Sequence, residues 1–325
     1  MRQQRFKAYH RFRQFGGLGL LWQYTKMGGG PSITKGVFKL VNGKTNADNV
    51  YAEITRKVSP FLIQKYELYI SQQKERYDRM ELKHHHESVI WFCWLQGMEN
   101  APELVKACYN SIKTNIPDKE IRIVTYNNYT DWIDIPDYII YKFEKHRIPS
   151  ALFSDLLRLE LLIKYGGTWM DATVLCTGND YPQEVMDGDL FLFQHIRRND
   201  RRFYGISNWF ITACSNHKIL LILRDVLYQY WKDYSCTIQY YIFHLFFNKI
   251  ASLYPQEITS MPRGNRAIAL LLGDRLCKKY NGCEMEEILS RTCFHKLNYR
   301  IVQDLDISSD TFYAEIIRRY GIYTN

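Results

Sequence analysis

The sequence lacks the paired cysteines that mark zinc sites and small disulfide-rich folds. Its 325 residues include eight cysteines, and no two of them form a CxxC pair. Zinc ligands and disulfide frameworks show close, regular cysteine spacing, so neither is predicted here. The cysteines are instead expected to be reduced thiols, most of them buried.

Long apolar runs are also absent. The segment GGLGLLW, residues 16–22, is too short and too rich in glycine to cross a bilayer. A cleavable signal peptide would need a longer apolar region followed by a small-residue cleavage site. We therefore expect a cytoplasmic protein.

The first residues combine basic and aromatic side chains. In MRQQRFKAYHRFRQF, the aromatic residues Phe6, Tyr9, Phe12 and Phe15 recur every three positions among arginines and lysine. Such a segment fits peripheral contact with the anionic inner face of a bacterial membrane. A solvated basic tail is the alternative.

Several nucleotide-binding signatures are missing. The sequence has no GxGxxG, no GxxxxGK[ST] and no GxSxG, so a dinucleotide fingerprint, a Walker loop and a hydrolase elbow are not predicted. The 43 basic residues outnumber the 34 acidic ones and give a net charge of +9, which favours anionic partners. The basic residues are spread along the chain without a nucleic-acid module, so nucleic acid is not the favoured partner.

The sequence does contain an alternation of apolar runs and helical patterns. Continuous apolar runs predict buried strands, and apolar residues that recur every three or four positions predict helices. Expected strands cover 88–97, 119–128, 168–176, 189–196 and 206–214, and expected helices cover 51–82, 101–115, 150–165 and 217–234. This order predicts an α/β fold with a mostly parallel sheet flanked by helices, and a largely helical remainder from residue 237.

One segment places three charged side chains in apolar surroundings. In SALFSDLLRLELLIKYGGTWMDATVL, Asp155 and Arg158 are three residues apart in the expected helix and share one of its faces. Two glycines are expected to end this helix, and Asp171 lies in the strand that follows. Burying a carboxylate costs free energy unless a cation or several hydrogen-bond donors contact it. We therefore expect Asp171 to have such a cation or such donors beside it. An ordinary ion pair on the helix surface is the alternative for Asp155 and Arg158.

The block FSDLLRLELLIKYGGTWMDATVL, residues 153–175, resembles the core signature of capsular polysaccharide synthesis glycosyltransferases, relatives of the DXD-containing family 32 glycosyltransferases. Shorter stretches continue the similarity: IWFCWLQG, ISNWFITA, IQYYIFHLFF and CFHKL. The resemblance covers about residues 88–300 as a GT-A-like domain. It leaves 1–87 as a basic N-terminal arm with a helical extension and 301–325 as a C-terminal helical tail.

The resemblance implies a GT-A fold, in which a Rossmann-type sheet and a carboxylate motif with a divalent cation, Mn²⁺ or Mg²⁺, hold the donor diphosphate. It implies that Trp94 stacks on the donor base. It also implies that Asp155 and Arg158 are catalytic residues that hold the donor's ribose or sugar and its phosphate, with Asp171 and Thr173 also in contact with the donor. Asp171 matches the first Asp of the DXD motif, as a catalytic residue and metal ligand, but Thr173 stands in place of the second Asp. A hydroxyl can ligate a hard cation but carries no charge, so weaker metal binding is expected.

The resemblance implies three further residues. His295 in FHKL corresponds to a late metal ligand or phosphate contact, although a histidine of the core or surface is an open alternative. Asn208 and Trp209 in ISNWF resemble a segment on the acceptor side.

The expected function is transfer of a hexose from a nucleotide-sugar donor, with a UDP-sugar favoured, to a hydroxyl of a bacterial surface or capsular glycan, including a lipid-linked one. The family relation suggests retention of anomeric configuration. Two alternatives remain open at this point. One is a relative that binds sugar nucleotides without catalysis, suggested by Thr173, and the other is a nucleic-acid-binding protein, suggested by the charge and the tyrosines.

Overall fold

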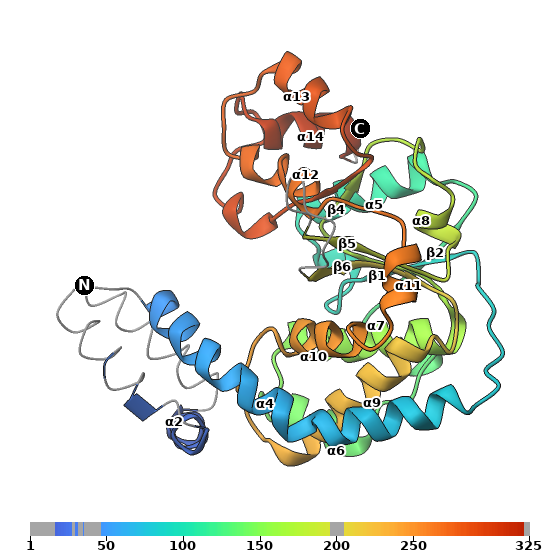
Figure 1. The fold of residues 1–325 in the computed structure, drawn as a ribbon. Helices are drawn as coiled ribbons and strands as arrows, with labels where there is room; N and C mark the ends of the chain where they lie inside the picture. The colour runs from blue at the N-terminus through green and yellow to red at the C-terminus, as the bar shows by residue number, and fades with distance from the viewer. Residues whose placement is uncertain (1–16, 28–29, 32–34, 36–46, 196–204, 322–325) are drawn as a thin grey trace. The chain divides into compact units, whose positions relative to one another are not determined.

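The structure is a computed structural model that describes residues 17–27, 30–31, 35, 47–195 and 205–321 (Figure 1). The basic aromatic segment at residues 1–15, with its expected membrane contact, lies outside the described residues. Among the helices that are described, none combines the length and the apolar character needed to cross a bilayer. The chain divides into two compact units, each assembled from three separate stretches of sequence.

The first unit is helical and draws on residues 1–81, 134–157 and 218–253. Its described elements are α2 (Gly17–Lys26), α4 (Ala47–Asp78), α6 (Asp137–Glu144), the first half of α7 (Ser150–Tyr165), α9 (Lys218–Asp233) and α10 (Ile242–Ala251). In α4 the side chains of Val58, Leu62, Tyr66 and Ile70 are all buried, because residues four apart lie on the same helix face. The predicted helix at 51–82 is thus confirmed, and α4 packs against α9 and α10.

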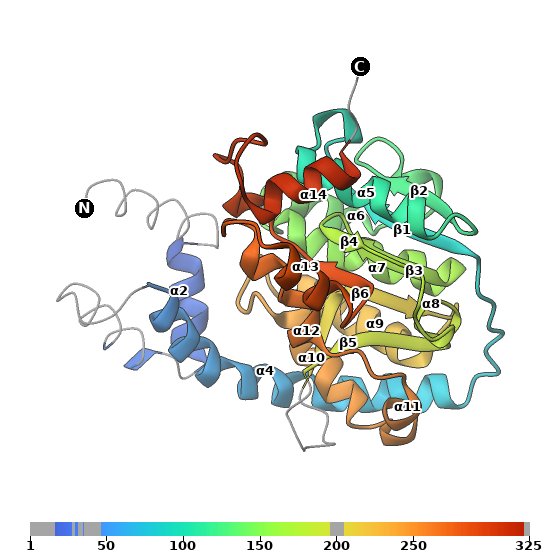
Figure 2. The ribbon, with the colours of Figure 1, turned by 90° about the horizontal axis from the view of Figure 1, so that it is seen from above.

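The second unit contains the sheets and draws on residues 82–133, 158–217 and 254–325. Its main sheet is built from β1 (Val89–Cys93), β2 (Glu120–Val124), β3 (Gly167–Asp171), β5 (Leu190–Gln194) and β6 (Ile206–Ala213). The strand order is β2-β1-β3-β6-β5 (Figure 2). β1 runs parallel to β2 and β3, whereas β6 runs antiparallel to both β3 and β5. Four of the five strands therefore point the same way, which confirms the predicted mostly parallel sheet.

Alternate residues of β1 face two different surroundings, because successive side chains of a strand point to opposite faces. Ile90 and Phe92 belong to a buried cluster that includes residues of α5 (Glu103–Asn115). Between them, Trp91 is also buried, and its indole Nε1 donates a hydrogen bond to Gly166 O at 3.0 Å. The strand is therefore apolar along its whole length, as expected for a buried parallel strand.

Helix α7 ends at two glycines, as the sequence predicts. Gly166 and Gly167 have φ angles of 70° and 91°, in the left-handed region that glycine adopts without steric cost. Gly166 N donates to Leu162 O at 2.9 Å and so closes the end of the helix. At Gly167 a Cβ atom would lie 2.6 Å from Val89 Cγ1 and 2.7 Å from Val89 O. The glycines let the chain pass directly from α7 into β3 while β3 lies against β1.

The single strand predicted over residues 168–176 is wrong, because the structure divides it into two strands in different sheets. β3 ends at Asp171, and after a turn at Ala172 and Thr173 the chain continues as β4 (Val174–Cys176). β4 pairs antiparallel with β7 (Phe294–Lys296) in a separate two-stranded sheet. The turn residues are compatible with a continuous strand, so only the distant pairing with β7 reveals the break.

The remaining elements of the second unit are short. They are α8 (Glu184–Asp187), α11 (Pro255–Ser260), α12 (Arg266–Leu270), α13 (Gly282–Leu289), α14 (Phe312–Tyr320) and 3-10 turns at Met98–Asn100, Tyr129–Asp131, Gly273–Arg275 and Tyr299–Ile301. α14 packs on α5, where Asn110 Nδ2 donates to Tyr320 O at 2.9 Å. The largely helical character of the C-terminal part is confirmed, and the domain boundaries at 87/88 and 300/301 stay predictions.

All eight cysteines are free, as expected, but fewer are buried than expected. Cys108, Cys176 and Cys214 are buried, whereas Cys277 and Cys283 are exposed. The two exposed thiols lie at or next to short elements of the C-terminal region, where small helices bury only one side.

Candidate functional site

The candidate site lies where the parallel strands β1 and β3 end. Cys93, the last residue of β1, pairs in register with Asp171, the last residue of β3. The carboxyl ends of parallel strands meet at one edge of a sheet, where ligands bind in open α/β folds. Trp94 follows β1 directly, so the topology brings two residues from separate sequence motifs to the same edge.

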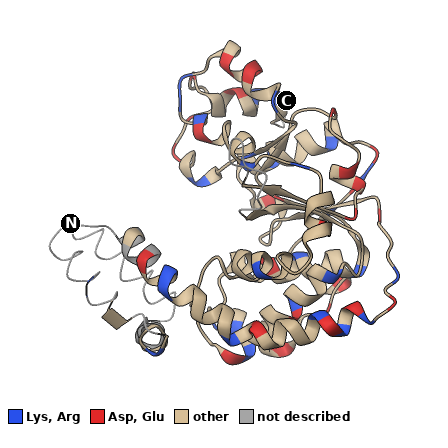
Figure 3. Cartoon of the chain, viewed as in Figure 1, with Lys and Arg blue, Asp and Glu red and all other residues tan. Residues whose placement is uncertain are grey.

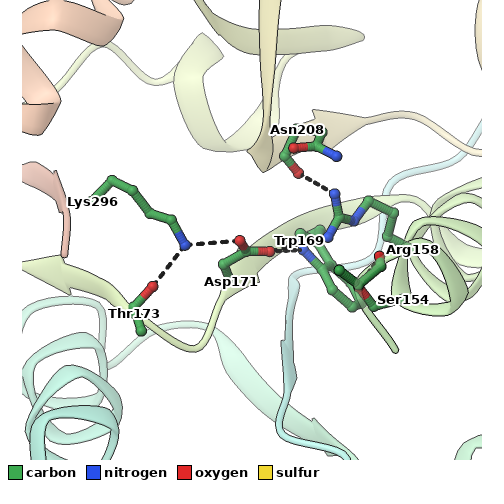
Figure 4. A network of polar contacts seen from close by, with 8 residues as sticks. Ser154, Arg158, Trp169, Asp171, Thr173, Asn208 and Lys296 are labelled. Carbon is green, nitrogen blue, oxygen red and sulfur yellow. Dashed lines mark hydrogen bonds and ion pairs between the residues drawn. The ribbon is translucent and has the colours of Figure 1, made fainter. Parts of the chain in front are cut away.

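Asp171 accepts hydrogen bonds on both carboxylate oxygens (Figure 4). Oδ1 receives Arg158 Nη2 at 3.1 Å and the indole Nε1 of Trp169 at 3.0 Å. Oδ2 receives the ammonium Nζ of Lys296 at 2.8 Å. The side chain is 27% exposed. These three donors supply the partners that the sequence predicts for a carboxylate in apolar surroundings.

Arg158 projects from α7 and is buried among neighbouring groups that it contacts. Its side chain is only 4% exposed, and Nη1 donates to the backbone oxygen of Asn208 at 2.8 Å. The guanidinium lies over the ring of Trp169, 4.9 Å from the centroid, which adds a cation–π attraction. Because Asp155 and Arg158 are both buried, the alternative of an ordinary surface ion pair does not apply.

Lys296 is the residue that the sequence analysis missed. It projects from β7, and its ammonium group lies 2.6 Å from Thr173 Oγ1 as well as 2.8 Å from Asp171 Oδ2. It lies in the stretch CFHKL, in which the resemblance points to the adjacent His295 instead. In a strand, alternation places only one of His295 and Lys296 in the core. A strand of three residues is too short a pattern to show which of the two it is.

The charges of the site favour the ionised carboxylate. Burial by itself raises the pKa of Asp171, but the charges of Lys296 and Arg158, together with hydrogen bonds from Lys296 and Trp169, outweigh it and hold the pKa below its usual value. One carboxylate and two cationic groups leave these three side chains with a net charge of +1. These three side chains by themselves favour an anionic ligand; the buried carboxylate of Asp155, one helical turn before Arg158, is not counted in this sum.

The divalent cation implied by the resemblance does not fit the residues found here. A hard cation needs several oxygen ligands with negative charge, whereas the oxygens of Asp171 and Thr173 already accept hydrogen bonds from Lys296. Two unit charges of like sign about 4 Å apart repel by about 4 kcal/mol at an effective dielectric constant of about 20, and a dication doubles this. Within the described part of the chain, no group of three His, Cys, Asp or Glu residues could hold a metal ion.

His295 lies in the core, away from the carboxylate. It is fully buried, and its Nε2 lies 3.1 Å from Thr177 Oγ1. Because His295 and Lys296 are consecutive in β7, their side chains point to opposite faces. Burial lowers the pKa of His295 to about 4. The structure thus favours the alternative of a core histidine over a metal ligand.

The buried histidine makes stability depend on pH. In the folded chain the pKa of His295 is about 4, against 6.5 for an unperturbed histidine, so between these values only the unfolded chain takes up the proton. The free energy of unfolding should therefore fall as the pH drops from about 6.5 to 4, by about 3 kcal/mol from this group. Urea unfolding of the wild type and His295→Leu at pH 7 and pH 4 measures the effect. The variant should lose about 3 kcal/mol less than the wild type on acidification, and an equal loss in both would contradict the assignment.

The other predicted residues occupy different surroundings. Trp94 is half-buried and makes an edge contact with the ring of Tyr299, at 5.4 Å between centroids. Trp209 is buried and stacks on Phe193 at 4.5 Å. Asn208 approaches Arg158 through its backbone oxygen, and Asp155 lies one helical turn before Arg158 in α7. The roles of Trp94 at the donor base, of Asn208 and Trp209 at the acceptor and of Asp155 at the donor stay predictions.

A family model for capsular polysaccharide synthesis proteins matches residues 40–316 of the chain. No curated protein matches it. Several solved structures show a distant likeness, including the following two. The PaToxG glycosyltransferase is 14% identical over 71% of this chain and 92% of its own, with a TM-score of 0.34. The catalytic domain of alpha-toxin from Clostridium novyi is 11% identical over 85% of this chain and 83% of its own, with a TM-score of 0.30.

Proposed function

The chain belongs to the family of capsular polysaccharide synthesis proteins, and from this premise we propose that it is a glycosyltransferase. In this proposal it moves a hexose from a nucleotide sugar, with a UDP-sugar favoured, to a hydroxyl of a bacterial capsular or surface glycan, free or lipid-linked.

The observation that carries the proposal is the cationic group around Asp171. Arg158 and Lys296 meet this carboxylate at the carboxyl end of β3, where open α/β sheets bind their ligands. A sugar nucleotide brings two negatively charged phosphates to such an edge. An arginine fork and an ammonium group are the side chains best suited to phosphate oxygens.

The proposed reaction needs charge stabilisation more than a protein base. The bond between the anomeric carbon and the diphosphate oxygen breaks, and its electron pair stays on the diphosphate. A lone pair of the acceptor hydroxyl forms the new bond to the same face of that carbon, and the hydroxyl proton passes to the released diphosphate. Negative charge therefore grows where Arg158 and Lys296 can stabilise it. This course retains the anomeric configuration.

A panel of nucleotide sugars tests the proposal. A ligand that binds only the folded state raises the melting temperature, and at 100 times its Kd it stabilises the protein by about 2.7 kcal/mol. We expect one of UDP-glucose, UDP-galactose, GDP-mannose and their N-acetyl or deoxy relatives to give such a shift. Release of the free nucleoside diphosphate, measured with that donor and a capsular glycan acceptor, then reports catalysis. No shift with any donor contradicts the proposal, and a shift without release indicates a binding relative that lacks catalysis.

The nucleic-acid alternative finds less support in the distribution of charge. Basic and acidic residues are interleaved along the same described helices (Figure 3). In α4, for example, Lys74 pairs with Asp78 at 2.5 Å and Arg79, just beyond the helix, pairs with Glu75. A nucleic-acid surface concentrates positive charge on one face, and neighbouring carboxylates cancel it.

A further inference from the structure

We propose that the ammonium group of Lys296 holds the donor diphosphate in the place where a divalent cation is expected, so that nucleotide binding by this chain needs no metal ion. This inference rests on the proposed function, because it assigns one residue to the diphosphate of a nucleotide-sugar donor.

The ammonium group of Lys296 lies where the motif would place a metal ion. Nζ of Lys296 lies between Asp171 Oδ2 and Thr173 Oγ1, at 2.8 and 2.6 Å (Figure 4). These two side chains occupy the two acidic positions of the DXD motif, to which the resemblance assigns the metal. Two of the three N–H groups of the ammonium have these oxygens as acceptors. The third has no acceptor among the described residues and is suited to a phosphate oxygen.

Backbone pairing of β7 with β4 fixes the position from which the Lys296 side chain projects. Lys296 pairs with Val174 in the two-stranded sheet, and Leu297 N donates to Thr173 O at 2.8 Å. The preceding His295 is anchored in the core. Lys296 therefore emerges from a fixed strand rather than from a surface loop, and its side chain remains 21% exposed, so that a ligand can reach it.

The charges of the group also favour an ammonium over a dication. With Arg158 beside them, two carboxylates without a lysine would carry a net charge of −1 and would need a dication before an anionic diphosphate could approach. Here a threonine replaces one carboxylate, and Lys296 and Arg158 bring the group to +1. Thr173 suits this arrangement, because its hydroxyl accepts a hydrogen bond from the Lys296 ammonium without adding a negative charge that would repel the diphosphate.

The test measures binding of UDP and GDP to the full-length protein by calorimetry, first after dialysis against EDTA and then with 1 mM MnCl₂. We expect the wild type to bind one of the two diphosphates in EDTA, with a Kd within about threefold of the value in manganese. Lys296→Met should weaken binding at least tenfold in both buffers, because an isolated charge-assisted contact is lost. Lys296→Arg keeps the charge and should retain most of the affinity. Lys279→Met removes a lysine that is 84% exposed and should bind as the wild type does.

The outcomes separate this inference from the function on which it rests. Binding that appears only with manganese, or a Lys296→Met variant that binds as tightly as the wild type, overturns the role of Lys296 and leaves the glycosyltransferase proposal intact. Failure of the folded wild type to bind either diphosphate or any nucleotide sugar, in both buffers, overturns the proposed function itself. Folding of each variant is checked by its melting temperature.

Discussion

Asp171→Asn should lower kcat/KM for sugar transfer by about a thousandfold, or about 4 kcal/mol in the transition state. Both oxygens of Asp171 accept hydrogen bonds, from Arg158 and Trp169 on one side and from Lys296 on the other. An asparagine has one acceptor oxygen and one NH₂ donor, so in either orientation its NH₂ group faces another donor. The variant also leaves two cationic side chains close together without their counter-charge, and neither keeps its position at the diphosphate.

The measurement is steady-state transfer with the donor identified by the thermal-shift panel. Asp118→Asn removes an exposed carboxylate from the same unit and serves as the matched control, with activity expected within twofold of the wild type. The melting temperature of Asp171→Asn separates loss of activity from loss of fold. A folded Asp171→Asn variant that retains more than a fifth of wild-type kcat/KM would remove Asp171 from the catalytic site.

Gly167→Ala should destabilise the fold by about 4 kcal/mol and lower the melting temperature by about 10 °C. At this residue φ is 91°, a conformation that costs an alanine about 1–3 kcal/mol. The new Cβ would also lie 2.6 Å from Val89 Cγ1 and 2.7 Å from Val89 O. The second contact is with backbone of β1, which cannot move without disturbing the parallel pair that carries the site.

Gly282→Ala gives the comparison within the same chain. Gly282 begins α13, and a Cβ there meets its nearest atom, Tyr280 Oη, at 3.5 Å, an ordinary contact distance. Its unfolding free energy should stay within about 1 kcal/mol of the wild type, since alanine favours a helix over glycine. Urea unfolding of both variants and of the wild type measures these differences in the free energy of unfolding. If Gly167→Ala were as stable as Gly282→Ala, the close approach of β3 to β1 would not depend on glycine.

The local part of the site could be predicted from the sequence. The leucine-rich helix, the two glycines and the strand with its single carboxylate are adjacent in the chain, and each leaves a short-range signal. Arg158 could be placed for the same reason, because it lies on that helix and close in sequence to Asp171. The mostly parallel sheet followed from the order of strands and helices along the chain.

The partner of Asp171 on its other side could not be predicted. Lys296 reaches the site only because β4 leaves the main sheet after Thr173 and pairs with β7. A two-residue turn within an apolar run leaves no pattern, and the pairing joins segments far apart in the sequence. The sequence motif therefore predicts a metal ion beside Asp171, where the structure places the ammonium group of Lys296.

The distance along the chain between Asp171 and Lys296 has a consequence during protein synthesis. The two residues are 125 positions apart, and a ribosome that adds about 5 to 20 residues per second needs about 6 to 25 s to bridge that interval. Throughout this time the growing polypeptide presents the aspartate and Arg158 without the lysine. If Lys296 holds the donor diphosphate as proposed, a product released before β7 has been translated would lack one of the two cationic side chains that meet Asp171.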